Sequence, residues 1–127
     1  MDARTYFTVS SVVGILYALG FLLIPGNMVL MFGGPPEAHV ILNLQFCGAG
    51  LLAWGVISWF ARDFRDWGAV RGVLIGNVVG DAVLVVLTVY AALTGLLNKL
   101  TWGSAIVVAL LLLWGLYCLM AGARKTA

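Results

Sequence analysis

Four long apolar runs constrain this chain more than any other feature of its sequence. They cover residues 6–24, 40–61, 68–93 and 102–121, and only short linkers separate them. A helix needs about 20 apolar residues to cross the hydrocarbon core of a bilayer. Because backbone polar groups inside lipid must be satisfied within each span, we predict an all-α polytopic membrane protein. The expected architecture is an antiparallel four-transmembrane-helix bundle that forms a single membrane domain over residues 1–127.

The composition supports lipid rather than water as the solvent for these runs. Hydrophobic residues make up 63% of the chain and charged residues 9%, whereas a soluble domain has about 25% charged residues. The net charge is only +2, and the basic residues are dispersed. Nucleic-acid binding needs clustered Lys and Arg, so we expect no nucleic-acid partner and expect membrane lipids around the helices.

The basic residues predict an orientation. Cytoplasmic segments of membrane proteins carry an excess of Lys and Arg. With both termini cytoplasmic, Lys99 is the one basic residue outside, and the other six lie inside: Arg4, Arg62, Arg65, Arg71, Arg124 and Lys125. We therefore expect a multi-pass protein of the cell inner (plasma) membrane, with cytoplasmic N- and C-termini.

The first linker contains an apolar segment, Met28 to Phe32, that is too short to cross a membrane. One interpretation places it in the outer interface, closed by Pro35 and Pro36. An ordinary loop with apolar contacts to the bundle explains it equally well.

Glycines recur every four residues in the third run, at Gly72, Gly76 and Gly80. Small residues at this spacing line one side of a helix and allow another backbone to approach closely. We predict that this glycine zipper packs against another helix. The pattern does not say whether that helix belongs to the same chain or to a second protomer.

Asp81 lies at the centre of the third run, where a charged carboxylate is costly. At about 100° per residue, Asn77 and Thr88 fall on the same side of the helix. No Lys or Arg lies at similar depth, which favours the uncharged acid. In a functional interpretation Asp81 exchanges a proton or binds a cation or a polar ligand head. In a structural one it ties helices together through hydrogen bonds.

Neutral side chains on other helices are the expected partners of Asp81. They are Ser10, Tyr17, Asn43, Gln45, Ser58 and Tyr117, together with Asn77 on its own helix. The predicted polar intramembrane site comprises Asp81, Asn77, Thr88, Asn43, Gln45 and Tyr17. Asn43 and Gln45 also lie near the outer end of the second run, where they either line a pocket with His39 or bond neighbouring loops.

The residues that carry most enzyme and metal chemistry are sparse. His39 is the single histidine, and with Glu37 alone beside it the ligand set for a metal is incomplete. The sequence contains no paired acids, phosphate-binding loop or nucleophile constellation. We expect no catalytic residues, no metal and no cofactor, and hence a protein that is not an enzyme.

The pattern of polar and small residues resembles those of two protein families. The relevant positions are Asn43 to Trp59, Arg71-Gly72, Gly76 to Asp81, Gly95 to Asn98 with Trp102, and Tyr117. They resemble an uncharacterised family of small bacterial four-helix integral membrane proteins, which implies no particular activity. The step Gly76-Asn-Val-Val-Gly-Asp81 is also faintly similar to ergosterol-biosynthesis membrane scaffold proteins, which implies tethering of membrane enzymes without catalysis.

Three hypotheses follow. The first is a non-catalytic accessory or scaffold subunit that associates with itself or with a larger membrane complex through the glycine face. The second is a small proton- or cation-coupled carrier or channel that uses Asp81. The third is a protein that binds a lipid or another hydrophobic small molecule between its helices or under Met28 to Phe32.

Overall fold

The computed structural model describes residues 2–126, and the side chains of residues 2–122. These residues form five helices: α1 (Ala3–Leu23), α2 (Pro25–Met31), α3 (Ala38–Ala61), α4 (Trp67–Leu93) and α5 (Leu100–Thr126). The all-α prediction is confirmed. The side chains of Arg124 and Lys125, used above to predict the orientation, lie outside the described ones.

Four of the helices are long and apolar enough to cross a membrane: α1, α3, α4 and the part of α5 from Leu100 to Gly122. Each begins one to three residues before the corresponding apolar run. Capping explains two of these earlier starts. Asp2 accepts a hydrogen bond from the backbone N–H of Thr5, and Asp66 accepts one from Ala69, so each carboxylate satisfies a free N–H in the first turn.

The apolar segment of the first linker is a short helix, which neither interpretation of the sequence included. Pro25 occupies the first turn of α2, where its missing N–H costs nothing. Val29 is buried, whereas Leu30 and Met31 are exposed. The helix ends before Gly33, whose φ of +83° favours glycine. The segment contacts both α1 and α3.

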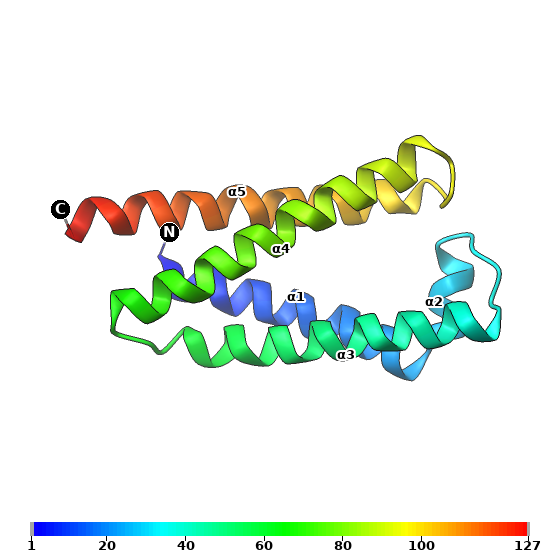
Figure 1. The fold of residues 1–127 in the computed structure, drawn as a ribbon, viewed down its shortest axis with the longest axis horizontal. Helices are drawn as coiled ribbons and strands as arrows, with labels where there is room; N and C mark the ends of the chain where they lie inside the picture. The colour runs from blue at the N-terminus through cyan, green and yellow to red at the C-terminus, as the bar shows by residue number, and fades with distance from the viewer. Residues whose placement is uncertain (1, 127) are drawn as a thin grey trace.

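The long helices pack mainly as two pairs, α1 with α3 and α4 with α5. Figure 1 shows α4 crossing the other helices obliquely, near α3 at one end of the bundle and near α5 at the other. Both termini and the α3–α4 turn lie at one end, called here the terminal end. The opposite end, with α2 and the α4–α5 connection, is called the loop end.

The α1–α3 pair is the place where helix backbones approach most closely through glycine. A Cβ atom on Gly55 would be 2.7 Å from Ile15 Cγ1, and one on Gly48 would be 2.9 Å from Phe21 Cβ. The hydroxyl of Ser11 donates a hydrogen bond of 2.7 Å to the carbonyl of Gly55. Small residues therefore allow α1 and α3 to pack tightly against each other.

The main apolar core lies toward the terminal end and joins all four long helices. Its buried members are Tyr6, Phe7, Ala61, Val70, Leu74, Leu111 and Cys118. The loop end is closed differently. The Asn98 side chain donates to the carbonyl of Met31 at 2.7 Å and accepts from the N–H of Leu100 at 3.0 Å. Asn98 therefore fastens the end of α2 to the start of α5.

Candidate functional site

A buried polar cluster occupies the contact between α1, α3 and α4. The amide nitrogen of Asn77 donates to the hydroxyls of Ser10 and Ser58, both at 3.3 Å. The Tyr6 hydroxyl donates to Oδ2 of Asp81 at 3.5 Å. These five residues, Tyr6, Ser10, Ser58, Asn77 and Asp81, are called here the polar cluster. Their side chains come from three of the four long helices.

The polar cluster is enclosed. Tyr6, Ser58 and Asn77 are fully buried, and Asp81 is 8% exposed. Tyr6 also packs edge-on against Trp114, with ring centroids 5.8 Å apart. Among the described side chains, Asn77 Oδ1, Trp114 Nε1 and Thr101 Oγ1 are buried without a hydrogen-bond partner. Hydrogen bonds between helices in lipid contribute about 0.6–2 kcal/mol each, so this arrangement can join the two helix pairs.

The partner of Asp81 is Tyr6, which was not among the neutral partners expected from the sequence. Tyr6 has the aromatic character of an interfacial belt residue, yet its hydroxyl faces inward to Asp81. Of the predicted neutral partners, Ser10 and Ser58 are present, but they bond Asn77 rather than Asp81. A signal was available, because Tyr6 and Ser10 are four residues apart and therefore share a helix face.

The other predicted site residues are not brought together. Thr88 donates to carbonyls of its own helix, at Leu84 and Val85. Tyr17 pairs with Ser104 at 3.1 Å, and Gln45 donates to the carbonyl of Leu22 at 3.4 Å. Asn43 is exposed on α3 and takes part in none of the side-chain hydrogen bonds of the described residues.

The glycine repeat of α4 contacts the rest of the chain at one position. A Cβ atom on Gly76 would be 2.9 Å from Cη2 of Trp54 on α3, whereas one on Gly72 or Gly80 would have nothing within 4 Å. Trp54 therefore fills the space beside Gly76. Beside Gly72 and Gly80 the described chain leaves open space.

The side of α3 that carries Trp54 is also not covered by other helices toward the loop end. Asn43, Cys47, Gly50 and Trp54 lie within about 60° of one another around the helix. The first three are exposed, and a Cβ atom on Gly50 would meet nothing within 4 Å. The helices α3 and α4 thus touch at Trp54 and Gly76 and then separate. The exposed residues Asn43, Cys47 and Gly50, together with the partly exposed Gly80, are called here the α3–α4 face.

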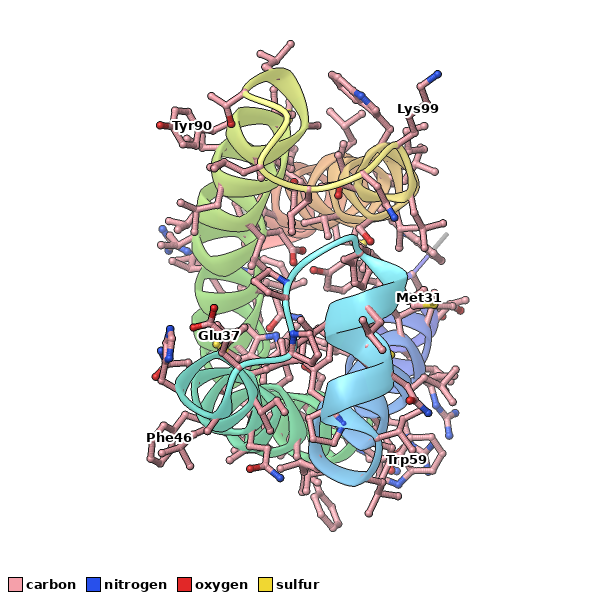
Figure 2. The ribbon with its side chains drawn as sticks, turned by 90° about the vertical axis from the view of Figure 1, so that its right-hand side faces the viewer. Met31, Glu37, Phe46, Trp59, Tyr90 and Lys99 are labelled. Carbon is pink, nitrogen blue, oxygen red and sulfur yellow. The ribbon has the colours of Figure 1, made fainter. Side chains whose placement is uncertain are left out.

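Figure 2, seen from the loop end, shows Phe46 on α3 and Tyr90 on α4 projecting outward from the bundle. Both are well exposed, as is usual for apolar side chains that lipid covers. Glu37 and His39 at the start of α3 are also exposed and lie 3.5 Å apart. Residues 2–122 contain no group of three or more His, Cys, Asp and Glu side chains placed to hold a metal ion.

Comparison with known proteins leaves the family open. No protein-family model, curated protein or solved structure matches this chain.

Proposed function

We propose that this protein is a non-catalytic membrane subunit that associates laterally with a second copy of itself through the α3–α4 face. The observation that carries the proposal is the pair of glycines beside the Trp54–Gly76 contact. Gly50 and Gly80 lie on neighbouring helices, and each has open space where a side chain would be. Small residues that are not used within a chain give a transmembrane helix of another chain room to approach.

Asn43 supports a second copy as the occupant. An exposed amide in a membrane span gains by finding a hydrogen-bond partner within protein. An amide carries both a donor and an acceptor, so two Asn43 side chains related by a two-fold axis can pair with each other. Such an interface is self-complementary, as in most homodimers. A helix of a larger membrane complex is the other possible occupant, and the experiment below distinguishes it.

The location follows the distribution of charge. Six of the seven basic residues belong to the terminal end of the bundle, and Lys99 belongs to the loop end. The positive-inside tendency then supports cytoplasmic termini, and the family resemblance implies the inner membrane of a bacterial cell. The enclosed polar cluster supports a role in holding α1, α3 and α4 together, so the proposal assigns Asp81 to helix packing rather than to transport.

The natural Cys47 allows a direct test, because it is exposed on the α3–α4 face whereas Cys118 is buried. The protein carrying Cys118→Ser is treated with a mild oxidant in native membranes and separated without reductant. The proposal predicts a disulfide-linked homodimer that Gly80→Leu reduces about tenfold, equivalent to about 1.4 kcal/mol. The open space at Gly80 lets the single chain tolerate the leucine.

Two variants serve as matched controls. Gly103→Leu on α5 also enters open space and is expected to leave crosslinking unchanged. Moving the thiol one residue, with Phe46→Cys and Cys47→Ser, places it on an exposed face at the same depth and should abolish the homodimer. A crosslink to a different protein would show that the occupant of the α3–α4 face is a helix of a larger complex rather than a second copy. Equal crosslinking from residues 46 and 47 would refute the α3–α4 face.

A further inference from the structure

A cavity of about 610 Å³ opens at the terminal end of the bundle, apart from the α3–α4 face. Its apolar lining includes Phe7, Trp67, Val70, Tyr117 and Cys118, which come from α1, α4 and α5. Tyr117 is 55% exposed, so the cavity communicates with the surface of the molecule. The volume lies within the range of about 300–1,000 Å³ that is usual for small-molecule sites.

Two guanidinium groups stand at the polar side of this cavity. Arg4 and Arg62 both line it, and both bond the carboxylate of Asp63, at 3.3 and 3.4 Å. The guanidinium of Arg62 also lies 3.5 Å from the centre of the Trp59 ring, which fixes its plane. Each guanidinium has five N–H donors, so the shared carboxylate leaves most of them available. Two adjacent guanidiniums suit a phosphate group.

The same site also carries negative charge. Asp2 lines the cavity, and its carboxylate accepts from the hydroxyl of Thr5 at 2.6 Å and from its N–H at 2.9 Å. The Thr5 hydroxyl and then the Thr5 backbone hold the pKa of Asp2 below its ordinary value, so Asp2 is ionised at neutral pH. Two arginines balance Asp2 and Asp63, and the net formal charge of these four side chains is zero.

We propose that this cavity binds the headgroup of a zwitterionic, phosphatidylethanolamine-type lipid, with its phosphate beside Arg4 and Arg62 and its ammonium beside Asp2. The balance of charge favours this head over an anionic one, which would leave Asp2 facing a phosphate without a cation. The ammonium carries N–H donors for the Asp2 carboxylate, whereas the quaternary nitrogen of a choline head carries none. The cavity lies where the long helices begin or end, which is the depth of lipid headgroups.

Native mass spectrometry of the detergent-solubilised protein tests this assignment. Phosphatidylethanolamine, phosphatidylcholine and phosphatidylglycerol with identical acyl chains are titrated separately, and the bound fraction gives each apparent Kd. Phosphatidylethanolamine should bind at least about fivefold more tightly than the other two. Free inorganic phosphate should not displace it at concentrations where O-phosphoethanolamine does. Equal affinity for the three lipids, or tighter binding of phosphatidylglycerol, would overturn the proposal.

Matched variants separate this cavity from general attraction of arginines to lipid. Arg4→Gln with Arg62→Gln should weaken phosphatidylethanolamine binding about tenfold. Arg65→Gln with Arg71→Gln removes two exposed arginines at the same end of the bundle that do not line the cavity. This second pair should change the affinity for phosphatidylethanolamine less than about twofold. An equal loss of phosphatidylethanolamine affinity in the two double variants would contradict binding at this cavity.

Two further variants test the ammonium position and the cavity itself. Asp2→Asn should bring the affinity for phosphatidylethanolamine down to that for phosphatidylcholine. Ala121→Phe fills the cavity without altering its charge. It should weaken the binding of all three lipids, while circular dichroism shows an unchanged helix content. Unaltered lipid binding in Ala121→Phe would place the lipid elsewhere. The inference is independent of self-association, because the Arg4 and Arg62 variants should crosslink through Cys47 as the unmodified protein does.

Discussion

The indole of Trp54 on α3 lies so close to Gly76 on α4 that a Cβ atom at residue 76 would be 2.9 Å from its Cη2 atom. This contact is where the two helices meet before they separate toward the loop end. It divides the glycine repeat of α4 into one position that packs within the chain and two, Gly72 and Gly80, that face open space. Substitutions at the three glycines should therefore have different effects on the stability of the folded chain.

Gly76→Leu should destabilise the folded chain, because Trp54 cannot move without disturbing the α3–α4 contact. Overpacking of this type costs about 1–3 kcal/mol. Gly72→Leu should leave stability unchanged or slightly raised, since leucine favours a helix more than glycine does. Thermal unfolding in detergent, followed by circular dichroism, compares the two. Equal effects at residues 72 and 76 would show that Trp54 does not occupy the space beside Gly76.

Asn77→Leu should weaken the association of the two helix pairs, because it removes the amide that donates to Ser10 and Ser58. We expect a loss of about 1–2 kcal/mol, the upper part of the range for hydrogen bonds between membrane helices. Thr88→Val is the control on the same side of α4, since the Thr88 hydroxyl bonds only its own helix. Its effect should stay within about 0.5 kcal/mol. The prediction fails if the two variants unfold at the same temperature.

Asn98→Ala should loosen the loop end. The variant loses the bond to the carbonyl of Met31 and the bond from the N–H of Leu100, together worth about 1–2 kcal/mol. Hydrogen exchange should speed up in residues 28–34 and in the first turn of α5. Thr94→Ala, whose hydroxyl bonds carbonyls of its own helix, should leave these segments protected. Unchanged exchange in Asn98→Ala would contradict the fastening role.

The cap at Asp2 should make the first turn of α1 sensitive to acid. Bonds from Thr5 hold the pKa of Asp2 below its ordinary value of 3.8. A lowered folded-state pKa means that the cap stabilises fully above the unfolded value and is lost as the pH falls through the folded one. The difference in melting temperature between the unmodified protein and Asp2→Ala should be constant from about pH 8 to 5 and shrink below about pH 4. A difference that grows on acidification would contradict it.

The four long helices were predictable because lipid imposes length and apolarity on each span, and these are properties of the sequence alone. The starts of α1 and α4 were missed by one to three residues because Asp2 and Asp66, which are polar, cap the helices before the apolar runs begin. Helix α2 was missed because seven residues with a proline and a glycine carry little periodicity. Its fold depends on contacts with α1 and α3.

The site was predictable only in part. Asp81 and Asn77 were predicted as site residues because they are polar residues in an apolar run, and both are buried. Tyr6 was not predicted as a site residue, because its place at the start of the first apolar run puts it at the edge of that span. Helix α4 crosses the bundle obliquely (Figure 1), so residues at different positions along two helices come to the same level. That tilt arises from packing between helices and cannot be read from one span.

Spin labels on Cys47 in lipid nanodiscs, with Cys118 replaced by serine, test the proposed self-association most directly. Pulsed dipolar spectroscopy then measures the distance between the labels of two copies. We predict a narrow, short distance, as for helices packed about 8–10 Å apart, that disappears in Gly80→Leu and persists in Gly103→Leu. A signal indistinguishable from that of magnetically dilute single copies would contradict the assignment of the α3–α4 face.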